Sequence, residues 1–132
     1  MAGSEICILI VDDEDRLRRG LVTFLEDEGF EVLSVASGEE GIQALRERCV
    51  DVGIIDLRLP GIDGNEVIER AHELRPEMKV LIHTGSANYR LPQRLIALGV
   101  EPWQVFQKPL EDMNVLVEAI RRLLGTTRGV GL

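Results

Sequence analysis

Five short runs rich in Val, Ile and Leu alternate along the chain with longer segments whose apolar residues recur at helical spacing. Runs this continuous are typical of parallel strands that are covered on both faces. Strands that alternate with helices favour an α/β architecture with a doubly wound parallel sheet. The strands are expected at 6–11, 30–35, 52–55, 80–83 and 103–106. The 132 residues suit one such domain with one core.

The five helical segments are bounded by residues that commonly start or stop helices. The stops of the first, third, fourth and fifth segments are Gly29, Pro76, Gly99 and Gly125. The second segment has Ser37 as its expected N-cap and Glu40 three residues later, which is the pattern of a capping box. Pro92 lies inside the fourth pattern, so that helix is expected to begin there and not near Asn88.

The net charge of −8 limits what the chain can bind. Binding to the phosphates of DNA or RNA needs clustered Lys and Arg, so direct binding to nucleic acid is not expected. The same charge disfavours an anionic membrane surface, and no apolar run approaches the roughly 20 residues of a membrane-spanning helix. Residues 1–5 lack the basic and apolar regions of a signal peptide. The expected compartment is therefore the cytoplasm.

Polar side chains suited to one site follow the ends of four expected strands. They are Asp12 and Asp13 after the first run, Asp56 after the third, Thr84 after the fourth and Lys108 after the fifth. Right-handed crossovers bring the carboxyl ends of parallel strands to one edge, where ligands bind in such sheets. Packed carboxylates repel one another unless a cation or a proton compensates them. The sequence therefore predicts a cation-binding cluster at this edge.

The residue types of this cluster suit Mg²⁺ and phosphoryl chemistry. Mg²⁺ prefers oxygen ligands and usually binds through one or two carboxylates plus a phosphate. An aspartate can attack phosphorus to form an aspartyl phosphate, while a cation and a lysine neutralise the oxygens of the transferring group. Thr84 could donate a hydrogen bond to one of those oxygens. Taken singly, Asp12 and Asp13 could instead cap a helix, and Asp56 could belong to a turn before Pro60.

Four motifs, in their order and spacing, resemble the receiver domain of bacterial two-component response regulators. They are VDDED (11–15), IIDLRLPGIDG (54–64), HTG (83–85) and QKP (107–109), and the likeness runs from about Ile6 to Leu124. The resemblance implies a flavodoxin-like, doubly wound sheet of five parallel strands in the order 2-1-3-4-5, with five helices. It implies a receiver domain over 1–124, and 125–132 is expected to be a flexible tail or linker stub.

The resemblance also implies a role for each matching position. Asp56 would accept a phosphoryl group from a sensor histidine kinase or a histidine phosphotransfer protein. The Mg²⁺ ligands would be Asp12, Asp13, Asp56 and the backbone carbonyl of Arg58. Thr84 and Lys108 would contact the phosphoryl oxygens, and their response would change the surface from the fourth to the fifth helix.

Further features follow from the same resemblance. A cis peptide is expected at Lys108–Pro109, in keeping with the tolerance of X–Pro bonds for this isomer. Arg58 and Ser86 would tune the lifetime of the phosphoryl group. The output would pass to a separate protein or a fused effector domain, and a homodimer is compatible with this role. The chain is not expected to be an enzyme beyond its own phosphotransfer and autodephosphorylation.

One position departs from the family pattern. Receivers usually carry Tyr or Phe three residues before the lysine, where this chain has Val105. Strand alternation should aim Phe106 at the other face. Trp103, which has the parity of Val105, and Tyr89 are the candidates to replace the missing aromatic side chain.

Two other functions remain open at this point. A Mg²⁺-dependent phosphohydrolase with an aspartyl nucleophile would use similar residues, although such enzymes often place a second acid two residues after the nucleophile, where this chain has Arg58. A receiver-like binding module that signals without phosphorylation is the second alternative, and Val105 is the feature that favours it.

Overall fold

A computed structural model of the chain describes residues 5–125 and confirms the doubly wound α/β architecture. All four strand pairings are parallel, in the order β2-β1-β3-β4-β5. The strands are β1 (Cys7–Val11), β2 (Glu31–Val35), β3 (Val52–Ile55), β4 (Lys79–Thr84) and β5 (Val105–Gln107). The helices are α1 (Asp15–Asp27), α2 (Gly38–Glu47), α3 (Gly64–Leu74), α4 (Gln93–Ala97) and α5 (Asn114–Leu124), with a 3-10 helix η2 (Pro102–Gln104).

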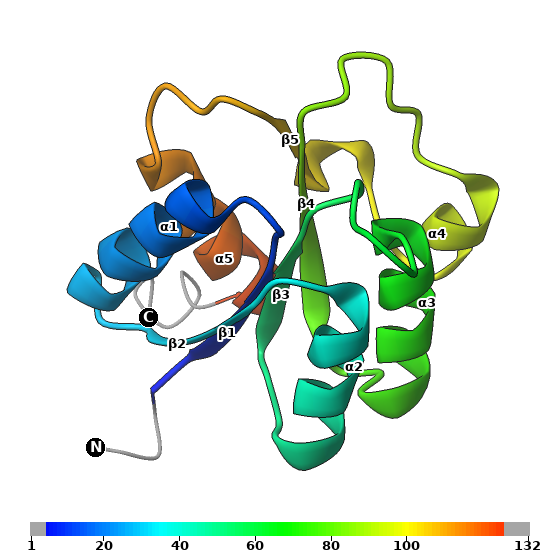
Figure 1. Cartoon of the computed structure of the whole chain (residues 1–132), viewed down its shortest axis with the longest axis horizontal. Coiled ribbons are helices and arrows are strands. Elements are labelled where there is room, and N and C mark those ends of the chain that lie inside the picture. The colour runs from blue at the N-terminus through cyan, green and yellow to red at the C-terminus, as the bar shows by residue number, and fades with distance from the viewer. Residues whose placement is uncertain (1–4, 126–132) are drawn as a thin grey trace.

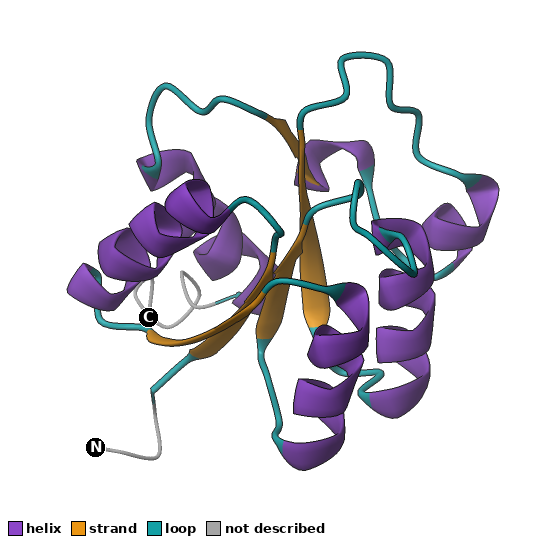
Figure 2. Cartoon of the chain, in the orientation of Figure 1, coloured by secondary structure: helices purple, strands orange, loops and turns teal. Residues whose placement is uncertain are grey.

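The helices cover both faces of the sheet. Figures 1 and 2 show α1 and α5 on one side of the central strands and α2, α3 and α4 on the other. In β1, Ile8 and Ile10 pack in the cluster under α1 and α5, whereas Leu9 and Val11 pack in the cluster under α2 and α3. Every residue of β1 is buried, which explains why the run is continuously apolar and does not alternate with polar residues.

The helix boundaries follow local signals in the sequence. The hydroxyl oxygen of Ser37 accepts a hydrogen bond from the backbone N–H of Glu40, as expected for the N-cap of α2. The Glu40 carboxylate reaches one residue further back than in a capping box and accepts from the backbone N–H of Ala36. Gly125 ends α5 in the left-handed conformation, with φ of 66°, which a glycine adopts without a Cβ clash.

The register of the sheet places four strand ends at one edge. Val11 at the end of β1 is paired with both Val35 of β2 and Ile55 of β3. The ladder continues one step past these ends, because the backbone N–H of Asp12 donates to Val35 and that of Asp56 donates to Val11. The residues that immediately follow β1 and β3 therefore lie side by side.

Most strand boundaries agree with the sequence expectation to within one residue, but the fifth strand and the fourth helix differ more. The fifth strand begins at Val105, because Pro102 starts the 3-10 helix η2 and removes Trp103 from the strand. The fourth helix is confirmed to begin after Pro92, but it is only five residues long, so Leu91 and Leu98 lie outside it. Both residues nevertheless pack against the core under α2 and α3, which explains their helix-like spacing.

Apart from Gly125, the segment 125–132 that was expected to form a tail lies outside the described residues. Between residues 5 and 125, no helix combines the length and apolar character that crossing a membrane would require.

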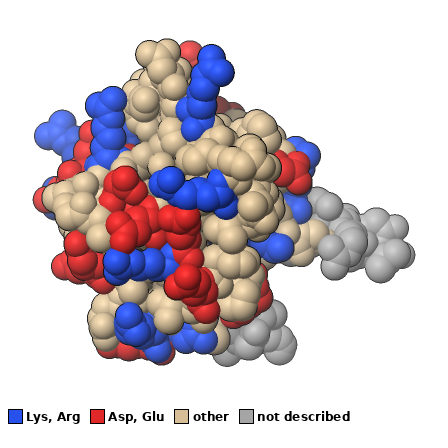
Figure 3. Space-filling view, turned by 90° about the vertical axis from the view of Figure 1, so that its right-hand side faces the viewer, with Lys and Arg blue, Asp and Glu red and all other residues tan. Residues whose placement is uncertain are grey.

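On the face that carries α3 and α4, basic side chains are scattered around a central acidic patch (Figure 3). Two ion pairs on this face, Arg70–Glu66 and Arg94–Glu69, belong to this mixed pattern.

Candidate functional site

Three aspartates meet at the carboxyl edge of the sheet. Asp12, Asp13 and Asp56 each offer a carboxylate oxygen, and these oxygens all lie within 4.8 Å of one another. Asp12 and Asp56 are buried, with exposed fractions of 2% and 4%, whereas Asp13 is open to solvent. The sequence prediction of a carboxylate cluster is confirmed, because the parallel register brings together residues that follow different strands.

Lys108 supplies positive charge to this cluster. Its Nζ atom lies 3.0 Å from Asp12 Oδ2, 2.9 Å from Glu14 Oε1 and 3.4 Å from Asp56 Oδ2. The backbone N–H of Lys108 donates to the carbonyl of Thr84 over 2.7 Å, which aligns the loop after β5 with the end of β4. The expected cis peptide is present between Lys108 and Pro109.

The loop after β3 brings Asp56 against the first turn of α3. Gly64 begins α3, and a Cβ at this position would lie 2.3 Å from the backbone oxygen of Asp56 and 2.7 Å from Cα of Leu57. Its backbone N–H donates to the carbonyl of Leu57. Only a glycine permits this approach, so Gly64 is a site-forming residue that was part of a motif in the sequence but had no assigned role.

Burial and charge act in opposite directions on the two central groups. Burial raises the pKa of the Asp56 carboxyl above its ordinary value, and Asp12 adds to this effect while Lys108 opposes it. Burial of Lys108 disfavours its ammonium, but the hydrogen bonds to Glu14 and Asp12, together with the charges of Asp12 and Asp56, raise the pKa of Lys108 above its ordinary value. The lysine is therefore charged at neutral pH, and the nearby acids still outnumber it.

The donor set fits a hard divalent cation. Three carboxylates converge at this site, and Lys108 forms ion pairs with two of them. Carboxylate oxygens are ligands that Mg²⁺ prefers. Arg58 lies in the loop two residues after Asp56, and its backbone N–H donates to Asp56 Oδ1 over 3.3 Å. This contact holds one carboxylate oxygen while the other faces Lys108.

Thr84 lies at the end of β4 beside this cluster and is 1% exposed. Its hydroxyl oxygen accepts a hydrogen bond from the backbone N–H of Ser86 over 3.0 Å, which orients the side chain and the start of the next loop. Thr84 is thus fixed at the edge where the sequence analysis expected it.

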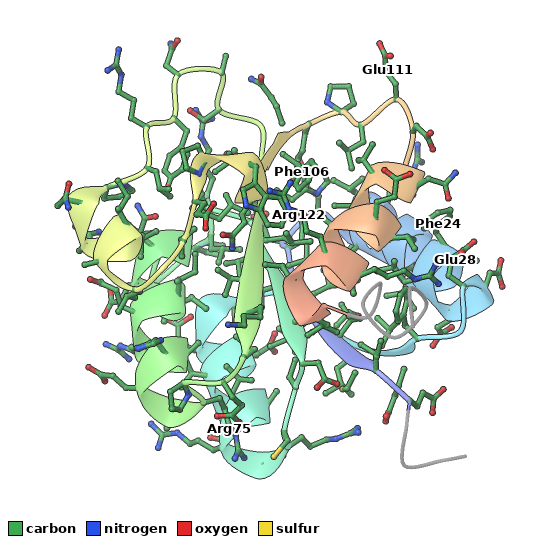
Figure 4. The ribbon with its side chains drawn as sticks, turned by 180° about the vertical axis from the view of Figure 1, so that it is seen from behind. Phe24, Glu28, Arg75, Phe106, Glu111 and Arg122 are labelled. Carbon is green, nitrogen blue, oxygen red and sulfur yellow. The ribbon has the colours of Figure 1, made fainter. Side chains whose placement is uncertain are left out.

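The suggestion that Trp103 could take the place of an aromatic residue at Val105 is wrong. Val105 and Tyr89 pack in the cluster under α2, α3 and α4, whereas Trp103 and Phe106 pack in the opposite cluster. The guanidinium of Arg122 lies 3.9 Å from the ring centroid of Trp103, and Figure 4 shows Arg122 of α5 near Phe106 of β5. Tyr89 remains the candidate, and its hydroxyl donates to Asn65 Oδ1 of α3 over 2.9 Å.

Two functional candidates had no role in the sequence analysis. Glu14 stood in the VDDED motif without an assigned function, and only the fold brings it to Lys108. His83 stood in the HTG motif without an assigned role. It is buried on β4, and neither ring nitrogen has a hydrogen-bond partner among the described residues. Burial lowers the pKa of His83 to about 4, with Lys108 adding to the effect, so the imidazole is neutral at pH 7. Glu14, His83 and Lys108 line the same pocket, which has a volume of about 390 Å³.

Comparison with known proteins gives one consistent family. Residues 8–121 match the family model described as "Response regulator receiver domain". The chain is 34% identical over 125 residues to the response regulator GacA of Pseudomonas aeruginosa, covering 93% of this chain and 57% of that protein. It is 31% identical to the response regulator GtcR of Aneurinibacillus migulanus, covering 92% and 47%. The chain thus spans about half the length of the curated relatives it matches.

Solved structures agree with this similarity. A CheY-like response regulator receiver domain protein from Methanospirillum hungatei superposes with a TM-score of 0.79 at 29% identity, covering 96% of this chain and 99% of that one. The response regulator TrrA of Thermotoga maritima, in complex with Mg²⁺ and BeF, superposes with a TM-score of 0.74 at 28% identity, covering 89% and 98%.

Proposed function

The chain belongs to the response regulator receiver domains, the phosphorylatable switches of two-component signalling, and we propose that Asp56 is the residue that accepts the phosphoryl group. The observation that carries this assignment is the position of the Asp56 carboxylate between the other aspartates and Lys108. Asp56 directly follows the buried strand β3, and its carboxylate lies in the aspartate cluster at the carboxyl edge of the sheet. In the transfer, one oxygen of Asp56 forms a bond to phosphorus while the bond between phosphorus and the leaving nitrogen of a phosphohistidine breaks.

Receiver domains bind Mg²⁺ at an acidic pocket, and we assign the ligands here to Asp12, Asp13, Asp56 and the backbone carbonyl of Arg58. When bound, Mg²⁺ neutralises charge on the oxygens of the transferring phosphoryl group. Asp12 is held for this role by the backbone N–H of Glu14, which donates to its Oδ1 atom over 2.9 Å. Lys108 supports the same site by offsetting carboxylate repulsion before any cation arrives.

Thr84 and Lys108 are the groups that would contact the phosphoryl oxygens on Asp56. Lys108 is within 3.4 Å of Asp56 Oδ2, and its backbone is hydrogen-bonded to that of Thr84, so a shift of one strand end is passed to the other. The loop after β4 leads to α4, and Tyr89 in this loop is bonded to α3. A change at Thr84 would therefore alter the surface from α4 to α5, which we propose as the output surface.

Response regulators exchange phosphoryl groups with histidine kinases and act through effectors. For this chain we propose a sensor histidine kinase or histidine phosphotransfer protein as donor, in the cytoplasm, and an output protein or fused effector domain as receiver of the signal. The mixed charge of the α3–α4 face supports contact with protein and not direct contact with nucleic acid (Figure 3). We propose no turnover beyond its own phosphotransfer and autodephosphorylation.

Intact-protein mass spectrometry tests the assignment directly. With Mg²⁺ and a small phosphodonor such as acetyl phosphate, the protein should gain the mass of one phosphoryl group, and Asp56→Asn should not. Asp63→Asn is the matched control, because Asp63 caps α3 in the same loop and asparagine is an equally good cap. Phosphorylation of Asp56→Asn at the wild-type level would refute the assignment.

A further inference from the structure

The ammonium of Lys108 lies within ion-pair distance of three carboxylates at once. A lysine carries three N–H donors, and three carboxylates surround Nζ here, those of Asp12, Glu14 and Asp56. The contact to Glu14 is the shortest at 2.9 Å, and the contact to Asp56 is the longest at 3.4 Å. Full contact between Lys108 and a phosphoryl group on Asp56 therefore requires Nζ to move away from another carboxylate.

The three partners differ in what they can do when the site is loaded. Asp12 and Asp56 belong to the proposed Mg²⁺ and phosphoryl site. A bound cation would therefore compensate their charge if Lys108 moved away from them. Glu14 is outside the aspartate cluster that could hold a metal ion, and its side chain is 59% exposed. Its contact with Lys108 therefore does not depend on a carboxylate that the metal ion would use.

The backbone holds Glu14 in this place. Glu14 is the N-cap residue of α1, and its N–H is fixed by the Asp12 carboxylate over 2.9 Å. The guanidinium of Arg18 donates to the carbonyl of Asp12 over 2.7 Å and ties the same turn to α1. The Glu14 side chain thus projects from a hydrogen-bonded turn at the start of α1, and it lines the same pocket of about 390 Å³ as Lys108.

We infer that Glu14 is a positioning residue that holds Lys108 toward α1 and away from Asp56, and so limits how tightly the site binds a phosphoryl group. The inference rests on the proposed function, because it concerns the lysine that would contact this group. Removing the contact should free Lys108 to close on Asp56. An exposed ion pair is a weak restraint, so the expected gain in affinity for a phosphoryl mimic is about two- to fivefold.

The test measures two affinities, for Mg²⁺ alone and for beryllofluoride in saturating Mg²⁺, by isothermal titration calorimetry. Glu14→Asp keeps the charge but is one methylene shorter and cannot reach Lys108 from the same backbone. Glu14→Gln removes the charge. Both variants should bind beryllofluoride about two- to fivefold more tightly than wild type, and Glu14→Asp should leave the Mg²⁺ affinity unchanged. A purely structural role of Glu14 would not separate the two affinities in this way.

The matched control is Glu26→Gln, which makes the same charge change on an exposed residue of the same helix and should not alter either affinity. Tighter binding by Glu14→Gln alone would mean that charge repulsion, and not the contact with Lys108, limits affinity, and would overturn the inference. Unchanged or weaker beryllofluoride binding by both variants would overturn it as well. If wild type itself does not bind beryllofluoride with Mg²⁺, the proposed function fails and this inference falls with it.

Discussion

The Nζ atom of Lys108 lies 3.0 Å from Oδ2 of Asp12, and the two side chains are only 12% and 2% exposed. The lysine therefore stabilises two buried acids, Asp12 and Asp56, in the absence of a metal ion. Lys108→Met should lower the free energy of unfolding by about 3 kcal/mol in EDTA, because it leaves these carboxylates uncompensated. Saturating Mg²⁺ should recover much of this loss, since the cation takes over the compensation.

Urea unfolding with and without Mg²⁺ measures both effects of Lys108→Met. The control is Lys79→Met, which removes the charge of the chain's other lysine at the exposed start of β4, and should change stability by less than about 0.5 kcal/mol. Equal losses for the two variants in EDTA would contradict the proposed compensation by Lys108.

Asp56→Asn should stabilise the metal-free protein in a pH-dependent way. Burial raises the pKa of Asp56 above its ordinary 3.8, so the folded state holds a proton that the unfolded state has already lost. Ionisation of Asp56 therefore destabilises the folded state, and this loss of stability develops as the pH rises through the raised pKa of the folded state. The variant should be more stable than wild type at pH 7 in EDTA, and the difference should vanish as the pH falls toward 3.8. Melting temperatures between pH 3.5 and pH 7.5 test this, and a difference that grows toward low pH would contradict it.

His83 should make the opposite contribution to the pH profile. Its pKa is lowered from 6.5 to about 4, so the unfolded chain takes up a proton that the folded state resists. This contribution to stability is complete above pH 6.5 and is lost as the pH falls to about 4. His83→Leu removes this pH-dependent contribution, along with two unpartnered nitrogens. As the pH falls from 6.5 to about 4, the free energy of unfolding of the variant should therefore rise by roughly 3 kcal/mol relative to that of wild type. Urea unfolding at pH 7.5, 5.5 and 4.5 gives the comparison, and a constant difference would rule out a buried neutral imidazole.

Gly64→Ala should damage the site, whereas Gly20→Ala should not. A Cβ at Gly64 would meet the backbone of Asp56 and Leu57, and this overlap should cost about 1–3 kcal/mol and displace the Asp56 loop. A Cβ at Gly20 in the exposed middle of α1 meets nothing within 4 Å, so alanine there should add about 0.5–1 kcal/mol of stability. Thermal unfolding and phosphorylation by a small phosphodonor measure the two consequences. Normal phosphorylation of Gly64→Ala would show that the close approach is not needed.

The sequence was enough for the elements and for the edge that carries the site. Each buried strand is a continuous apolar run, each helix except the short α4 has a 3.6-residue pattern, and both signals are local. Parallel strands share one direction, so Asp12, Asp56 and Lys108 were expected at the same edge once they were seen to follow strands. These are consequences of short-range order along the chain, and the structure confirms them.

Other features depend on contacts that no local pattern encodes. Trp103 was placed on the face of Val105 by counting from an assumed start of the strand, and the turn at Pro102 invalidates that count. The lysine was expected to serve the phosphoryl group, but its attachment to Glu14 depends on how α1 and the loop after β5 pack together. The sequence by itself determined which residues reach the carboxyl edge, because strand direction and burial are written in local spacing. Only the tertiary structure decided which partners share Lys108, because those distances arise from packing between segments far apart in the chain.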